Sequence, residues 1–105
     1  MGYARPKPKR LAEKLRAIRN ALGLSKTEMF RRLGVDQFID YTKISAFESD
    51  DREPSLMVLL QYARVAGVNM EVLADDELDL PERLPGQTNH EEIRRQFTHR
   101  RRSRR

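Results

Sequence analysis

The stretch that decides the fold is GLSKTEMFRRLG, residues 23–34. Ser25 and Glu28 match a capping box, in which the serine side chain accepts from an amide three residues on and the glutamate reaches back. The pattern predicts a helix that begins at Lys26. Met29, Phe30 and Leu33 supply its apolar face, and Gly34 ends it.

A longer helix is expected just before this stretch. Its apolar positions recur at spacings of four, three and four, which places them on one helical face: Leu11, Leu15, Ile18 and Leu22. The polar positions between them are assigned to the solvent face: Glu13, Lys14, Arg16 and Asn20. Gly23 follows Leu22 and ends the helix, so the two helices are separated by only a short turn.

Three further helices are expected after Gly34. The first runs from about Tyr41 to Ser49, with Asp40 as its N-cap. Pro54-Ser55 opens the next, which Gly67 closes, and the last lies near residues 70–74. The buried stripe of the longest of the three is predicted as Leu56, Leu59, Leu60, Ala63 and Ala66. Val72 and Leu73 point inward from the last helix.

These elements predict an all-α, compact five-helix domain with no strand. The chain has 105 residues with a hydrophobic fraction of 38%, which suits one small domain with solvated appendages. It holds no Cys, which excludes disulfides, thiolate zinc sites and thiol nucleophiles. Both histidines, His90 and His99, lie in the polar tail, so we expect no catalytic site, no metal and no cofactor.

Charge divides the chain into a near-neutral body and two basic ends. Residues 1–10 carry +4, residues 11–89 carry -4 and residues 90–105 carry +5, which sum to the formal charge of +5. We therefore expect a basic N-terminal arm at 1–10, a helical domain at 11–74, an acidic, proline-containing linker at 75–88 and an Arg-rich tail at 89–105. Asn89 can cap a short helix in that tail. Basic arms suit a polyanion, most simply a nucleic acid backbone.

The order of a capped two-turn helix, a glycine, a turn and a second helix is the skeleton of a helix-turn-helix. The stretch from Leu11 to Leu73 resembles the lambda-repressor-like, Xre/Cro-type helix-turn-helix domain in the order and spacing of several short motifs. These are Leu15-Arg16-x-x-Arg19, Gly23-Leu24-Ser25-Lys26-x-Glu28-Met29, Leu33-Gly34-Val35, Ile44-Ser45-x-x-Glu48, Arg52-x-Pro54-Ser55-Leu56 and Leu60-x-x-Ala63-x-x-x-Gly67-Val68-x-x-x-x-Leu73.

The resemblance implies roles for particular residues. It places base contacts on the recognition helix at Tyr41, Thr42, Ser45, Ala46 and Ser49. It places phosphate contacts at Lys26, Lys43 and Arg52, to which the basic arm adds Lys7, Lys9 and Arg10. Arg19 and Glu48 match a structural ion pair that fixes the angle of the recognition helix.

The turn before the recognition helix departs from the family pattern. It holds about four extra residues, Asp36-Gln37-Phe38-Ile39. Either the turn becomes a loop whose Phe38 and Ile39 pack against the core, or the recognition helix begins a turn earlier at Gln37. The second arrangement would bring Gln37 and Asp40 closer to the DNA groove.

The resemblance implies a sequence-specific transcriptional regulator that binds operator DNA, not an enzyme, and that acts on double-stranded DNA as a homodimer. The candidate dimer face is the last helix, through Val72, Leu73 and Leu78. Two alternatives remain open: the antitoxin of a toxin-antitoxin pair, with a protein partner bound by the C-terminal extension, and a protein- or RNA-binding module. The sequence has neither a membrane-length apolar run nor a secretory N-terminal stretch, so a cytoplasmic location is expected.

Overall fold

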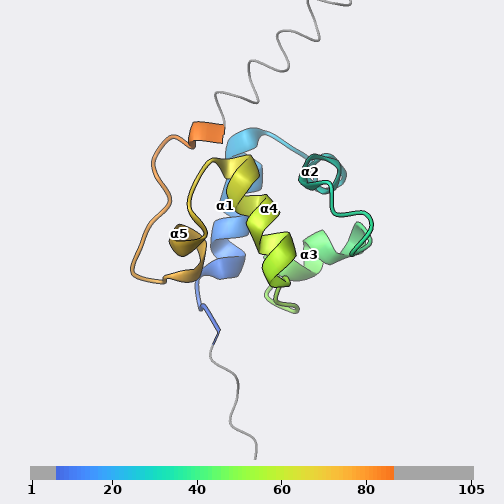
Figure 1. Cartoon of the computed structure of the whole chain (residues 1–105), viewed down its shortest axis with the longest axis horizontal. Helices are drawn as coiled ribbons and strands as arrows, with labels where there is room; N and C mark the ends of the chain where they lie inside the picture. The colour runs from blue at the N-terminus through green and yellow to red at the C-terminus, as the bar shows by residue number, and fades with distance from the viewer. Residues whose placement is uncertain (1–6, 87–105) are drawn as a thin grey trace, which may run out of the picture.

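A computed structural model describes residues 7–86 of the chain. Within this range it contains five α-helices and no strand, which confirms the all-α fold expected from the sequence (Figure 1). The helices are α1 (Leu11–Leu22), α2 (Lys26–Leu33), α3 (Thr42–Glu48), α4 (Leu56–Ala66) and α5 (Met70–Ala74).

The ends of α1 and α2 lie where local sequence signals predicted them. Ser25 Oγ accepts from the Glu28 amide at 3.1 Å, and the Glu28 carboxylate accepts from the Ser25 amide at 2.9 Å. This capping box starts α2 at Lys26, and Gly23 and Gly34 end α1 and α2. The short turn between the two helices therefore follows directly from side chains within it.

The extra residues before α3 form a loop, so the helix does not begin at Gln37. The amides of Phe38 and Ile39 both donate to the Val35 carbonyl, at 2.9 and 3.1 Å. Ile39 packs against the core, as the loop alternative predicted. The prediction that Phe38 also packs there was wrong, because its side chain is 61% exposed. Successive side chains on this tight turn diverge, and only one of them reaches the core.

The buried stripe of α4 differs from the predicted one. Leu56, expected inside, is 71% exposed, and Leu60 is only half-buried. The side chains that face the core are Val58, Leu59, Tyr62, Ala63 and Ala66. Ser55 caps α4 through the Val58 amide, so Leu56 occupies the first helical position, beyond the edge of the core.

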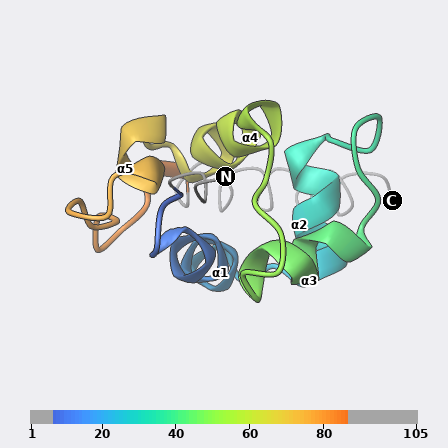
Figure 2. The same cartoon turned by 90° about the horizontal axis from the view of Figure 1, so that it is seen from below.

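The helices pack around α1 and α4. α1 contacts α3 and α5, while α4 contacts α2 and α5, and α2 also contacts α3. In Figures 1 and 2, α2 and α3 lie on one side of the α1 and α4 pair, and α5 lies on the other. The largest fully buried apolar side chains come from all five helices and from the turn after α2: Leu15, Ile18, Met29, Val35, Ile44, Val58, Tyr62 and Leu73.

Residues 75–86 pack against the helices, which corrects the expectation of a linker for the part of 75–88 that the structure describes. Leu84 is 2% exposed and belongs to the hydrophobic core, and Leu80 packs against that core. The segment passes the start of α1 and returns to the C-terminal end of α4 (Figure 1). Its high acidic content hid these leucines, because average hydropathy does not identify single anchoring side chains.

Two glycines permit this return. Gly67 ends α4 with φ of 75°, and a Cβ there would lie 2.6 Å from the Gly86 nitrogen. A Cβ on Gly86 would lie 1.9 Å from the Val65 carbonyl oxygen. The backbones therefore approach more closely than any larger residue permits. The expected Arg-rich tail and its helix at 89–105 lie outside the described residues.

Candidate nucleic-acid interface

α3 presents a row of polar side chains on its outer face. Thr42, Ser45 and Ser49 are exposed and recur at spacings of three and four, so they lie on one helical face. Tyr41, directly before the helix, is 59% exposed, and Ala46 is half-buried. The structure therefore brings together the five residues that the resemblance assigned to base contacts. The opposite face, with Ile44 and Phe47, enters the core.

The three hydroxyl groups on this face differ in whether their hydrogen is already used in a hydrogen bond within the protein. Thr42 Oγ1 donates to Asp40 Oδ1, and Ser49 Oγ donates to Asp51 Oδ2 at 2.8 Å. The Ser45 hydroxyl has no hydrogen-bond partner within residues 7–86, so it can both donate and accept. Thr42 and Ser49 keep acceptor lone pairs. Of the three, Ser45 has the greatest capacity to read a base edge.

Asp40 fixes the start of α3. Its carboxylate accepts from the Thr42 amide at 2.9 Å and from the Thr42 hydroxyl, although the N-cap residue of α3 is Tyr41 and not Asp40 as predicted. The helix proper begins two residues later, at Thr42, and is shorter than predicted. The Thr42 side chain above all, and the nearby charge of Lys43, lower the pKa of Asp40. A carboxylate thus lies beside the row formed by Thr42, Ser45 and Ser49.

The N-terminus of α2 offers a second polar feature. Lys26 is the first residue of this eight-residue helix, and its side chain is exposed. Free amides and the helix dipole at this position favour an anion, and the ammonium of Lys26 adds a point charge. Lys26 thus lies where a backbone phosphate is expected.

Lys43 and Arg52 lie at the two ends of α3. Lys43 is half-buried within the first turn, and Arg52 is exposed in the connection between α3 and α4. Arg52 is held there by its backbone, because the amides of Asp51 and Arg52 both donate to the Ala46 carbonyl. The arrangement places one cation near each end of the exposed polar row on α3.

The residues of the basic arm that the structure describes differ in availability. Lys7 forms a 3.4 Å ion pair with Asp50, and both side chains are about half exposed. Lys9 is exposed, while its backbone amide donates to Asp76. Arg10 donates to Asp79 Oδ1 at 2.8 Å, and this hydrogen bond raises the pKa of Arg10. Arg10 is thus engaged within the domain, and Lys7 and Lys9 are the cations better placed for phosphates.

A partly buried ion pair joins α3 to α1. Arg19 on α1 donates from Nε and Nη2 to the two carboxylate oxygens of Glu48, at 2.7 and 2.9 Å. The Glu48 side chain is 4% exposed. Arg16 adds a 3.0 Å hydrogen bond to the Glu48 carbonyl, and Arg19 Nη1 donates to the Leu24 carbonyl at 3.0 Å. The structure brings the expected pair together, and it ties the end of α3 to α1.

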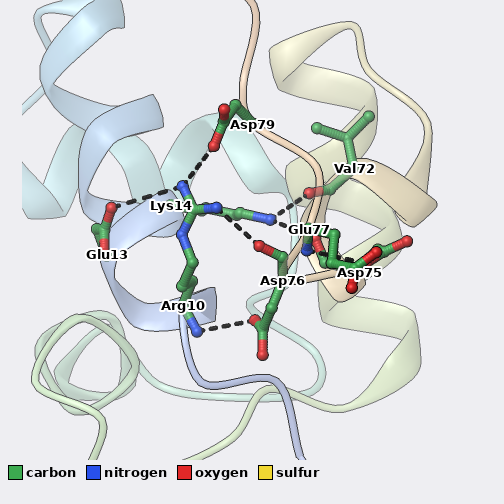
Figure 3. Close-up of polar contacts among 8 residues, drawn as sticks. All are labelled: Arg10, Glu13, Lys14, Val72, Asp75, Asp76, Glu77 and Asp79. Carbon is green, nitrogen blue, oxygen red and sulfur yellow. Dashed lines mark hydrogen bonds and ion pairs between the residues drawn. The ribbon is translucent and has the colours of Figure 1, made fainter.

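Sequence reasoning placed Lys14 on the solvent face of α1, and this was wrong. Lys14 is 2% exposed, and its Nζ donates to the carbonyls of Val72 and Asp75, at 2.7 and 2.8 Å (Figure 3). These are carbonyls at the end of α5, where a cation is favoured. A signal was present, because position 14 lies between Leu11 and Ile18 on the buried face.

The candidate dimer face on α5 is partly covered. Leu73 is fully buried, whereas Val72 and Leu78 are half-buried, and α5 contacts both α1 and α4. The large apolar side chains that remain exposed within residues 7–86 are Phe38, Tyr41, Leu56 and Met57.

The five-helix fold and the exposed polar helix held against α1 define a DNA-binding helix-turn-helix protein. A family model described as helix-turn-helix matches residues 15–73, and the chain belongs to this Xre/Cro-type family. The family consists of DNA-binding regulators and is not typically enzymatic. Comparison with curated proteins and with solved structures gave no match. Within residues 7–86, no helix has the length and apolar character needed to cross a membrane.

Proposed function

We propose that the protein is a sequence-specific transcriptional regulator that occupies operator DNA through α3. The observation that carries this proposal is the exposed row of Thr42, Ser45 and Ser49 on a helix anchored by the partly buried Arg19–Glu48 pair. Hydroxyl side chains can bond to base edges in the major groove, and a fixed helix presents them in one geometry. Tyr41 and Ala46 add apolar surface suited to a thymine methyl group.

Phosphate contacts are proposed for the cations around this row. Lys26, Lys43 and Arg52 supply them from the helical domain, and Lys7 and Lys9 supply them from the arm. Such contacts raise affinity for all sequences and carry no base preference. Because helix-turn-helix proteins commonly read two half-sites, we infer that a homodimer binds a palindromic operator.

The first test is selection of bound duplexes from a random pool at about physiological salt, followed by competition with non-specific DNA. The proposal expects a recovered motif, palindromic for a dimer, bound about 10³-fold or more tightly than non-specific DNA. Recovery of duplexes with no shared motif would overturn it. The antitoxin alternative rests on the C-terminal extension at 78–105, and the RNA-binding alternative rests on the Arg-rich tail at 89–105; of these, only residues 78–86 are described.

Variants then separate base reading from phosphate binding. Ser45→Ala is expected to relax the preference at one base pair, by about 1–3 kcal/mol. Lys26→Ala is expected to weaken binding to every sequence and to reduce the salt slope by about 1. Arg64→Ala is the matched control, because Arg64 is an exposed arginine in the last turn of α4. An unchanged base preference in Ser45→Ala would contradict the assignment.

A further inference from the structure

The segment after α5 holds the root of the N-terminal arm. The two carboxylate oxygens of Asp76 accept from the successive backbone amides of Lys9 and Arg10, at 2.9 and 3.0 Å. The Arg10 guanidinium donates to the Asp76 carbonyl at 2.7 Å and to Asp79 at 2.8 Å (Figure 3). We refer to these four residues, Lys9, Arg10, Asp76 and Asp79, as the clasp. It joins parts of the chain more than 60 residues apart.

Lys14 anchors the segment that carries Asp76 to α1. Its buried ammonium binds the carbonyls of Val72 and Asp75, directly before Asp76. Asp75 in turn accepts from the Glu77 amide at 2.9 Å, which shapes the turn around Asp76. The Asp76 carboxylate is therefore held relative to α1, and the amides that it binds are held with it.

The clasp determines where the arm lies. Lys7 and Pro8 line a shallow hollow together with Phe47 at the end of α3 and with Arg52 and Pro54. Lys7 lies 3.4 Å from Asp50 in that same connection. The arm therefore passes from the α5 side of the molecule to the end of α3, beside Arg52. Its Lys7 therefore lies at one end of the proposed DNA-binding helix.

We propose that Asp76 is a positioning residue for DNA binding. By holding the amides of Lys9 and Arg10, it keeps the ammonium groups of Lys7 and Lys9 where they add phosphate contacts next to α3. A free arm would lose conformational freedom on binding, and a held arm has lost it already. The inference rests on the proposed function, since it assigns an acidic residue a favourable role in DNA binding.

The test uses the full chain and compares Asp76→Asn with Glu77→Gln. Each variant removes one negative charge from the same segment, and the exposed Glu77 side chain makes no hydrogen bond or ion pair within residues 7–86. General electrostatics alone predicts equal or tighter DNA binding for both. The proposal predicts that Asp76→Asn binds a duplex from the selected pool about 3- to 10-fold more weakly, with a salt slope reduced by about 1–2. Glu77→Gln binds as tightly as the unchanged chain or more so.

A second background separates positioning from loss of fold. In a chain carrying Lys7→Ala and Lys9→Ala, Asp76→Asn is expected to cause no further loss of affinity, because the positioned cations are gone. Amide hydrogen exchange provides a structural measurement. In Asp76→Asn the amides of Lys9 and Arg10 should exchange faster, while those in the middle of α1 stay protected.

The failures of the two proposals are distinguishable. An unchanged chain that binds without a motif contradicts the proposed function. Motif-specific binding that Asp76→Asn strengthens or leaves unchanged contradicts only the role of Asp76. The role is also overturned if Asp76→Asn lowers DNA affinity by the same factor in the chain with Lys7 and Lys9 and in the chain without them. The effect would then not depend on the cations of the arm.

Discussion

At the scale of single residues, Tyr62 on α4 has a buried hydroxyl with no hydrogen-bond partner among the described residues. Its side chain is fully buried, and burial, helped by the Glu48 carboxylate, raises the pKa of Tyr62. Tyr62→Phe removes an unpaired polar group and keeps the ring. We expect the free energy of unfolding in urea to stay constant or to rise by up to about 1 kcal/mol. A clear fall in the free energy of unfolding would contradict this and would mean that the Tyr62 hydroxyl has a hydrogen-bond partner.

Asp50, just after α3, has φ of 65°, the one non-glycine residue with positive φ between residues 7 and 86. The Cβ atom of a non-glycine residue makes this left-handed conformation unfavourable, whereas glycine has no Cβ atom and adopts it readily. Asp50→Gly is therefore expected to raise the free energy of unfolding by about 0.5–1 kcal/mol in urea denaturation. The half-exposed ion pair with Lys7 offsets little of this. Asp51→Gly, with negative φ, is the control and should destabilise the protein.

At the scale of elements, the angle between α1 and α3 depends on Arg19 and Glu48. Glu48→Gln leaves the partly buried Arg19 guanidinium without its carboxylate, and removing one partner of a buried pair is expected to cost up to about 3–5 kcal/mol of unfolding free energy. Such a loss is large for a domain of this size. Thermal unfolding measured by circular dichroism checks this. Arg31→Gln, an exposed change at the end of α2, is the control. Equal stability of the two variants would contradict a structural role for the pair.

This expectation affects how DNA-binding data are interpreted. A Glu48 variant that fails to bind DNA reports a loss of fold or of helix angle, because Glu48 is 4% exposed and faces α1. Only variants on the outer face, such as Ser45→Ala, separate contact with DNA from support of the helix.

Element positions were predictable from the sequence where the signal is local. Capping by Ser25 and Glu28 and the glycines after Leu22 and Leu33 define α1 and α2 from neighbouring residues alone. The residues on the outer face of α3 were assigned from the resemblance to the helix-turn-helix family. The contacts of Lys14 and Asp76 could not be predicted. Their partners lie 58 or more residues away and are mostly backbone groups, which carry no sequence signature. Leu84 was hidden by its acidic surroundings.

At the scale of the whole molecule, the domain extends beyond the end of the family match at residue 73. Leu84, 2% exposed, anchors the returning segment to the core. Leu84→Ala is expected to cost about 2–5 kcal/mol of unfolding free energy in urea. Leu78→Ala, at a half-buried position of the same segment, should cost less. Equal small effects of both would mean that the segment contributes little to stability.

The dependence of stability on acid pH involves the same contact between residues 9–10 and Asp76. Hydrogen bonds from the Lys9 and Arg10 amides lower the pKa of Asp76. A carboxyl whose pKa is lower in the folded state stabilises the fold above its ordinary pKa, and this contribution is lost as the pH falls below about 4. Between pH 6 and pH 3, Asp76→Asn should therefore lose less unfolding free energy than the unchanged chain. Identical pH dependence in urea titrations would contradict this.

The clasp also has a consequence for protein synthesis. Lys9 leaves the ribosome before Asp76, yet its amide is bound by that carboxylate, 67 residues later in the chain. At roughly 5–20 residues per second, a nascent chain waits several seconds before Asp76 exists to receive it. Until then the cationic arm is free beside the ribosome, itself a polyanion. The ordered arm is thus among the last features to form, after the helices that it will accompany onto DNA.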